Sequence, residues 1–362
     1  MRQLLLCFLL VTVAPAFAEE FVRFGEMQRQ EFSPARNEVI KIPILLERKA
    51  EVRLTLFSVD DRAVRTLQVE SPLKKGAHEI VWDGKDDDGI TVPDEAWLPV
   101  ITASTESETV RVDPRTWSGG ETIEDIKLKQ NDLNSYSYKL NAPARVSIRA
   151  GIGGGPLLNL LADWEPHGAG RNILYWDGYD KNKLVKLSDS GKQKLVTAAF
   201  KLPDHSIITS GNRELNYRDY FQQKGWQQKT VDLSRVPLQR NQQPISRQYY
   251  IPYLMNKGPA VSIELLGDLK QSDTGFPIID GQVDIQVSMD DDSKQFMQES
   301  RYEIGFFVDH VFLSEEEQGY VPLTWRWKPN HLDPGKHILT VNVNGFRGQV
   351  GVSSLEFVVP EK

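Results

Sequence analysis

The stretch GAHEIVWDGKDDDG at residues 76–89 is repeated in outline 94 residues further along the chain. Trp82-Asp83-Gly84 with Asp86 matches Trp176-Asp177-Gly178 with Asp180, and no gap is needed across this span. A rare tryptophan followed by the same two residues is improbable by chance. A fixed offset between matching residues indicates duplicated units before any secondary structure is assigned. The sequence therefore predicts two related units.

The same offset extends to the residues before this stretch. The further matches are Leu46, Ala50, Val52, Leu67 and Gly76 with Leu140, Ala144, Val146, Leu161 and Gly170. We place the first unit at residues 19–112 and the second at residues 121–211. A connection rich in Gln, Arg and Tyr is expected at 212–258, and a third β unit at 259–362.

Apolar residues recur with a period of two throughout these units. Ile40, Ile42 and Ile44 alternate with other residue types, as do Val283 and Ile285 in the third unit. This spacing is typical of half-buried strands. Helical spacing is confined to short windows near 214–223 and 292–300. The sequence therefore predicts an all-β fold of tandem β-sandwiches, two related and a third following them.

Residues 1–18 have the pattern of a cleavable secretory signal peptide. Arg2 supplies the positive end, Leu4 to Val13 the apolar run, and Ala16-Phe17-Ala18 the cleavage site. A membrane anchor is the alternative, but it requires a longer apolar run than this one, which Pro15 interrupts. No later stretch is apolar enough to span a bilayer. We expect a periplasmic or extracellular protein without a transmembrane segment after cleavage.

Composition and charge exclude several functions. The 362 residues are 40% hydrophobic and 26% charged, a globular balance. Cys7 is the single cysteine and lies in the signal, so the mature chain has no disulfide, cysteine-bound metal or thiol nucleophile. Removal of Arg2 leaves 42 basic residues against 50 acidic ones. Nucleic acid is therefore not an expected partner, because phosphate binding requires clustered Lys and Arg.

The first unit resembles the Ig-like domain family of FlgD, the flagellar hook-capping protein, over about Phe32 to Ala103. The resemblance is carried by the alternating strand at 39–45, the strand and turn at 50–64, and above all residues 76–89. The second unit is similar more loosely, keeping Trp176-Asp177-Gly178-Tyr179-Asp180 but continuing with Lys181-Asn182-Lys183-Leu184. The first unit also has Glu95-Ala96-Trp97 where the family continues with Gly-Tyr or Gly-Val-Tyr. The resemblance implies a spacer or binding module. We expect that the chain is not the hook-capping protein itself, whose unfolded export region is absent.

Two motifs invite a ligand-binding interpretation. The acidic run at Asp83 and 86–88 has oxygen ligands suited to calcium, yet the spacing of a calcium loop is not met. A structural turn, in which Asp binds its own backbone and Trp lies in the core, is favoured. The run Gly151 to Pro156 is similarly favoured as a hairpin turn over a phosphate-binding loop. Asp290-Asp291-Asp292 is interpreted as a hairpin or a helix start.

The third unit contains the candidate binding surface. Trp325 and Trp327 share one face of a strand and form either a flat aromatic platform for sugar or peptide, or part of the core. Asp309 and His310 end the strand that begins with Phe306, and Glu315 to Glu317 are expected in the turn after it. No metal, cofactor or catalytic residue is predicted.

The leading hypothesis is an exported, non-enzymatic scaffold, adhesion or partner-binding protein of the bacterial cell envelope. Its expected partner is another envelope or extracellular protein, or a polysaccharide. The alternative is a polysaccharide-acting enzyme or carbohydrate-binding accessory protein that uses the C-terminal unit. An enzyme of that class requires two carboxylates about 5–9.5 Å apart across a cleft. The oligomeric state cannot be predicted from the sequence.

Overall fold

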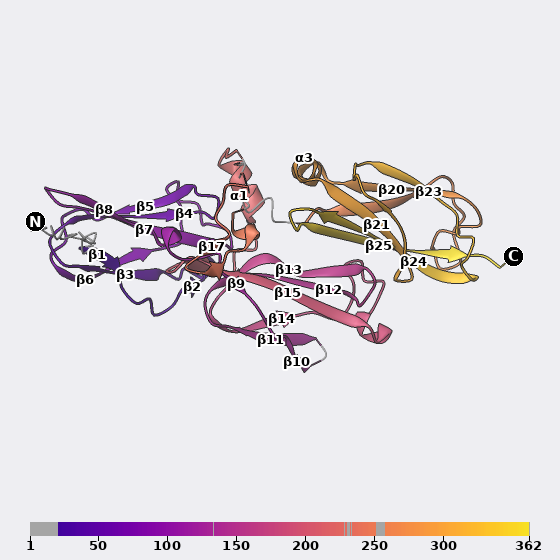
Figure 1. The fold of residues 1–362 in the computed structure, drawn as a ribbon, viewed down its shortest axis with the longest axis horizontal. Coiled ribbons are helices and arrows are strands. Elements are labelled where there is room, and N and C mark those ends of the chain that lie inside the picture. The colour runs from indigo at the N-terminus through magenta and orange to yellow at the C-terminus, as the bar shows by residue number, and fades with distance from the viewer. Residues whose placement is uncertain are drawn as a thin grey trace, which may run out of the picture.

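The computed structural model describes residues 21–361, apart from 133, 228, 230, 231, 233 and 251–257. The expected signal peptide at 1–18 lies outside the described residues. Strands account for 50% of the chain and helices for 8%, so the all-β prediction is confirmed. Figure 1 shows three lobes of strands, indigo, magenta and orange to yellow, with the magenta lobe below the other two.

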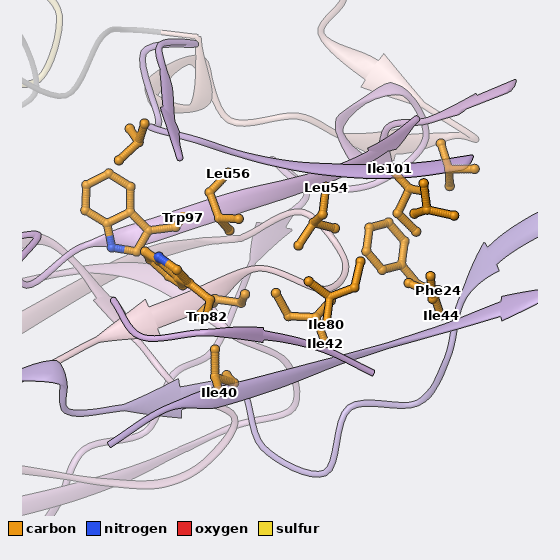
Figure 2. Close-up of a cluster of buried hydrophobic side chains, with 14 of the residues drawn as sticks. Phe24, Ile40, Ile42, Ile44, Leu54, Leu56, Ile80, Trp82, Trp97 and Ile101 are labelled. Atoms are coloured by element: carbon orange, nitrogen blue, oxygen red, sulfur yellow. The ribbon is translucent and has the colours of Figure 1, made fainter. Parts of the chain in front are cut away.

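The first lobe consists of two packed sheets. One is ordered β1 (Val22–Phe24), β3 (Ile40–Leu46), β6 (Gly76–Trp82). The other is ordered β2 (Glu31–Phe32), β16 (Ile207–Thr209), β7 (Ala96–Ser104), β4 (Glu51–Phe57), β5 (Ala63–Gln68), with β8 (Thr109–Val112) beside β7. Alternate residues of each sheet point inward, and Ile40, Ile42, Leu54 and Leu56 meet between them (Figure 2).

The second lobe repeats this arrangement with the same strand register. Its sheets are β10 (Lys129–Asp132), β11 (Ser135–Leu140), β14 (Gly170–Tyr175), and β13 (Leu157–His167), β12 (Ala144–Ile152), β15 (Gln193–Lys201), β9 (Thr122–Ile123). Leu46 faces Gly76 in the first lobe, and Leu140 faces Gly170 in the second. Both pairs differ by the offset of 94, so the two lobes share strand pairing as well as sequence.

The third lobe is a sandwich of different pattern. It contains β19 (Val261–Leu266), β20 (Val283–Met289), β23 (Leu323–Trp327), and β22 (Val311–Glu316), β21 (Tyr302–Val308), β24 (Gly335–Gly345), β25 (Val350–Val359). Helix α3 (Asp291–Ser300) begins where Asp290 accepts a hydrogen bond from the Ser293 amide, so the acidic run starts a helix. The short elements are η1 (Pro34–Arg36), η2 (Pro114–Thr116), η3 (Leu187–Ser190), η4 (Arg247–Tyr249), β17 (Gln239–Arg240) and β18 (Gln243–Pro244).

Trp82 and Trp176 occupy equivalent positions at the ends of β6 and β14. Their side chains are 0% and 5% exposed. Each indole nitrogen donates to a carbonyl three residues later, at 2.8 Å to Lys85 and 2.7 Å to Tyr179. A buried indole requires such an acceptor. The ring edges are thus fixed in the same way in both lobes.

The residues that follow each tryptophan form the same turn. The carboxylates of Asp83 and Asp177 each accept from the amide two residues later, both at 3.1 Å. Gly84 and Gly178 have φ of 75° and 84°, which only glycine adopts without strain. Asp86, fully buried, accepts from the amides of residues 88 and 90. These carboxylates are engaged by their own backbone, as expected of a structural turn.

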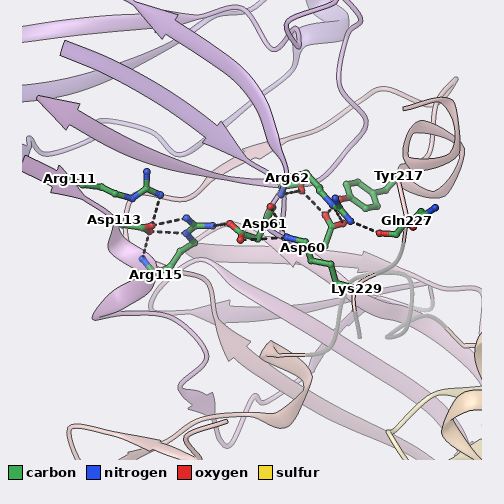
Figure 3. A network of polar contacts seen from close by, with 10 residues as sticks. Asp60, Asp61, Arg62, Arg111, Asp113, Arg115, Tyr217, Gln227 and Lys229 are labelled. Carbon is green, nitrogen blue, oxygen red and sulfur yellow. Dashed lines mark hydrogen bonds and ion pairs between the residues drawn. The ribbon is translucent and has the colours of Figure 1, made fainter. Parts of the chain in front are cut away.

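The connection after the second lobe packs against the first. Helix α1 (Tyr217–Gln223) buries Tyr217, Tyr220 and Phe221 in the core of the first lobe. The Tyr217 hydroxyl donates to Asp60 in the β4–β5 turn. Figure 3 shows how this contact continues through neighbouring ion pairs, in which Arg115 joins Asp61 to Asp113. The first lobe is therefore held at one end by a segment more than 150 residues away in the chain.

Candidate functional site

A buried ion pair joins the first and second lobes. Glu95 precedes β7 and is 0% exposed, and the Arg145 side chain on β12 is 3% exposed. The Arg145 guanidinium donates to the Glu95 carboxylate and, at 2.8 Å, to the Trp164 carbonyl. The Ala96 amide donates to the same carboxylate at 2.6 Å. Each charge therefore depends on its partner across the interface, because neither is solvated.

The second and third lobes are joined by hydrogen bonds between asparagine side chains and backbone groups. The Asn342 amide group on β24 donates to the Leu157 carbonyl and accepts from the Leu157 amide, both at 2.8 Å. Asn182, in the turn after Trp176, accepts from the Ser354 amide at 2.8 Å. Gly155 lies so close that an added Cβ would be 2.8 Å from the His310 carbonyl oxygen. The glycine-rich run is a hairpin turn that allows this close approach.

The first and third lobes are connected through helix α1. Lys224, after helix α1, pairs with Asp86 at 3.1 Å and with Asp88. From the same helix Arg218 lies 3.7 Å from both Asp290 and Asp292 at the start of α3. Each lobe therefore contacts the other two, either directly or through α1.

A groove of about 780 Å³ lies where the second and third lobes meet. We call it the junction groove. Its lining residues are Ile152, Gly153, Gly154, Leu184, Val185, Lys186, Asp189, Lys192, Asp309, His310, Val311, Phe312 and Ile338. Two of the residues singled out from the sequence, Asp309 and His310, lie in it. Ligand sites occur preferentially at such junctions between domains.

The structure corrects the expected local structure around Asp309 and His310. They form the two-residue turn between β21 and β22, with φ of 47° and 71°, rather than the end of a strand. Two positive φ values are typical of a two-residue hairpin turn. Glu315 and Glu316 belong to β22, rather than to the turn after β21. The prediction was wrong because the apolar run 311–313 was not taken for a strand.

Strand β22 exposes three consecutive apolar side chains. Val311, Phe312 and Leu313 are 65%, 51% and 39% exposed. A register shift between Phe306 and Phe307 on β21 leaves Leu313 as an extra residue, so the usual alternation is broken. In the described part of the chain β22 pairs only with β21 and forms the edge of its sheet. An edge strand with exposed apolar side chains is open to contact with another chain.

The Asp309 carboxylate fixes the turn beside this strand. It accepts from the Ile338 amide at 3.0 Å and contacts Nδ1 of His337 at 2.6 Å. Nε2 of His337 lies 2.8 Å from the Asp333 carbonyl. Both partners are acceptors, so this geometry is fully satisfied when both ring nitrogens donate, that is, when His337 is protonated. Burial opposes that charge, but the hydrogen bonds to Asp309 and Asp333 outweigh it and raise the pKa of His337.

We expect this pair to make stability pH-dependent. The pKa of His337 is higher in the folded protein than its unfolded value of 6.5. The contribution of His337 to the stability of the folded state is therefore fully present below pH 6.5 and is lost as the pH rises through the folded pKa. His337→Gln keeps a donor but cannot gain a proton. The difference in urea midpoint between the native protein and this variant should shrink from pH 5.5 to pH 8.5.

The difference in urea midpoint between the native protein and His337→Gln separates the contribution of His337 from that of the other histidines. Burial lowers the pKa of His167, His205 and His310, and these groups contribute with the opposite sign. Their effect is common to both proteins and cancels. A midpoint difference that stays constant over this pH range would show that His337 is not charged in the folded state.

Trp325 and Trp327 lie apart from the junction groove, on β23. Their rings stack on each other at 6.0 Å between centroids, and Trp325 stacks on buried Phe306 at 4.2 Å. Trp327 meets Phe357 edge-on at 5.6 Å. Both tryptophans are partly buried against the core of the third lobe. This packing favours the core interpretation over the open aromatic platform.

The glutamates at 315–317 are not brought together with Asp309 and His310. Glu315 and Glu317 line a second hollow of about 750 Å³ with Glu303, Tyr320 and Phe346. Within residues 21–361, as far as they are described, no group of three or more His, Cys, Asp or Glu side chains is placed to hold a metal ion. No helix in the same residues is long and apolar enough to cross a membrane.

Comparison with known sequences identifies one similar region. No protein-family model matches the chain. The basal-body rod modification protein FlgD of Salmonella typhimurium is 44% identical over 54 residues, which cover 15% of this chain and 23% of that protein. FlgD of Salmonella typhi matches equally. The chain thus contains a FlgD-like region and spans less than a quarter of the length of these curated relatives.

Two solved structures illustrate the likeness of the fold to known proteins. Trypsin-activated alpha-2-macroglobulin from Escherichia coli is 11% identical with a TM-score of 0.21, covering 94% of this chain and 23% of that one. A tetra-tandem repeat in the extending region of a large adhesion protein is 9% identical with a TM-score of 0.19, covering 94% and 74%. At these TM-scores the likeness indicates no shared function.

Sequence reasoning missed two features of the site. The apolar run 311–313 was available as a signal, because three consecutive apolar residues cannot all face one side of a regular strand. The ion pair of Glu95 with Arg145 had a weaker signal, the departure from the family pattern at residues 95–97. Neither residue type nor spacing indicates that these two charges meet.

Proposed function

We propose that this chain is an exported, non-enzymatic scaffold or partner-binding protein of the bacterial cell envelope. The exposed strand β22 beside the junction groove carries the proposal, because it offers apolar contact area on a framework in which each lobe is held by the others. Apolar residues in such a position lower the free energy of binding when a partner covers them. The partner we propose is another envelope or extracellular protein.

Three further features support this function. The two related lobes and the FlgD-like region are consistent with spacer and binding modules. The boundaries that we propose for the three units are 19–112, 121–211 and 259–362. The pattern of residues 1–18 supports export. The acidic balance of the chain disfavours nucleic acid as the partner. The polysaccharide alternative is less well supported, because Trp325 and Trp327 pack against the core.

Cross-linking in the native envelope tests the proposal. Cells that produce the full chain are treated with a membrane-permeant cross-linker, and the adducts of the native protein and of Phe312→Asp are compared. Phe312 is 51% exposed, so a charge there should leave the fold intact while it opposes apolar contact. We expect a discrete adduct with the native protein and its loss with Phe312→Asp.

Val81→Asp is the matched control. Val81 is 49% exposed on β6, an edge strand of the first lobe, and lies in a different lobe from the groove. This variant should keep the adduct. The proposal is wrong if the native protein remains in the cytoplasm, if it forms no adduct, or if both variants lose the adduct equally.

A further inference from the structure

His310 lies at the contact between the second and third lobes. Its side chain lines the junction groove, and its carbonyl oxygen faces Gly155 in the hairpin of the second lobe. The Nδ1 atom of its ring is buried and has no hydrogen-bond partner among the described residues. A neutral imidazole carries one N–H group, whereas a protonated imidazole carries an N–H group on both nitrogens. The junction as it stands is therefore suited to the neutral form of His310.

The charged groups that face His310 are already bound to other partners. The Asp309 carboxylate, in the same turn, contacts His337 and the Ile338 amide. Asp180, in the second lobe, is fully buried and accepts from the amides of residues 184 and 185. Burial lowers the pKa of His310, and its effect is larger than the opposing attraction of these two carboxylates. The other charged residues that line the groove are Lys186, Asp189 and Lys192.

The described contacts between these two lobes are mainly polar. In addition to the asparagine contacts, Arg149 donates to the Gly348 carbonyl at 2.7 Å, and Lys181 donates to the Val352 carbonyl at 3.1 Å. The apolar cores of the two lobes are separate, except that Ile338 of the third lobe packs against the core of the second. Water can take the place of either partner in a polar contact, so its net contribution is modest. The two lobes can therefore separate without exposing a core.

We propose that protonation of His310 separates the third lobe from the second, so that their junction acts as an acid-sensitive hinge. In the separated state water solvates the charged ring, whereas in the closed state one of its N–H groups is buried without an acceptor. A proton that binds one of two states more tightly shifts the population toward that state. Histidine is the side chain that titrates in mild acid. This inference goes beyond the proposed function and depends neither on export nor on a partner.

Energy transfer between two fluorophores tests the proposal. Cys7, the single cysteine of the sequence, lies in the expected signal peptide, so introduced cysteines are labelled selectively in the mature chain. We place one label at Tyr175→Cys in the second lobe and one at Lys328→Cys in the third, where both native side chains are exposed. We expect the transfer efficiency to change between pH 7.5 and pH 5, with a midpoint below 6.5, the value of an unperturbed histidine.

His310→Asn removes the titrating group and keeps the turn. Asparagine adopts the φ of 71° at this position more readily than most residues. The transfer efficiency of this variant should stay at its pH 7.5 value down to pH 5. His331→Asn is the matched control, because His331 is exposed in the same lobe, and it should change as the native protein does. Circular dichroism should be constant over this range, since separation leaves each lobe folded.

Gly155→Ala provides an independent reference for the separated state. An added Cβ would be 2.8 Å from the His310 carbonyl oxygen, so alanine pushes the hairpin and the turn apart. At pH 7.5 this variant should already have the transfer efficiency that the native protein reaches at pH 5. The proposal is overturned if the native efficiency is constant over the pH range, if His310→Asn changes as the native protein does, or if circular dichroism is lost with the same midpoint.

Discussion

Arg145→Ala should destabilise the protein by about 3–5 kcal/mol, because it leaves the Glu95 carboxylate buried without its partner. Glu95→Ala should have a similar effect by stranding the guanidinium. Replacement of both by apolar residues, Glu95→Leu with Arg145→Met, should restore most of the loss, since a buried ion pair and a well-packed apolar pair are often nearly equal in energy. Calorimetric unfolding of the variants measures these differences.

An exposed ion pair provides the comparison. Lys41 and Glu79 lie 2.7 Å apart on β3 and β6, with side chains 64% and 51% exposed. Lys41→Ala should cost only about 0.2–1 kcal/mol, because water solvates the remaining charge. If Arg145→Ala is no more damaging than Lys41→Ala, the interface between the first two lobes is not closed to solvent.

Trp82→Ala should destabilise the first lobe, and Trp176→Ala the second, each by about 3–5 kcal/mol. Trp82 packs edge-on against Phe32 and Trp97, and Trp176 packs on Tyr136, so each truncation leaves a cavity in one core. Hydrogen exchange followed by mass spectrometry reports the loss of protection lobe by lobe. Each variant should show its largest loss in its own lobe.

Trp117→Ala is the matched control for Trp82→Ala and Trp176→Ala. It is 42% exposed, so Trp117→Ala should change stability by about 0.5 kcal/mol or less. Uniform loss of protection over all three lobes in Trp82→Ala would show instead that the lobes unfold as one cooperative body.

The parts of the fold that depend on local pattern were predictable from the sequence. Alternation at Ile40, Ile42 and Ile44 predicted a strand, and the offset of 94 predicted a second lobe of the same register. The turn after each tryptophan was predictable because all of its determinants lie within a few residues of each other. They are a buried indole, a glycine with positive φ, and aspartates that accept hydrogen bonds from nearby backbone amides.

The contacts between lobes were not predictable in this way. Glu95 and Arg145 are 50 residues apart, and the departure from the family pattern at residues 95–97 does not identify Arg145 as the partner. The strand β22 was missed because its extra residue removes the period on which strand prediction depends. Lone sequence patterns predict elements well, whereas interfaces depend on which surfaces the elements present to each other.

The position of strand β16 in the first lobe affects the order in which the lobes can fold. It comes after the whole second lobe, yet it lies between β2 and β7 in the sheet of the first, where Ile208 pairs with Glu31. Because a chain is synthesised from its N-terminus, the first sandwich cannot be complete until about 180 residues after β2 have been made. Long-range closure of this kind slows folding. The lobe that is synthesised first is thus the one that must wait, with the side of β7 that β16 will cover still open to other proteins.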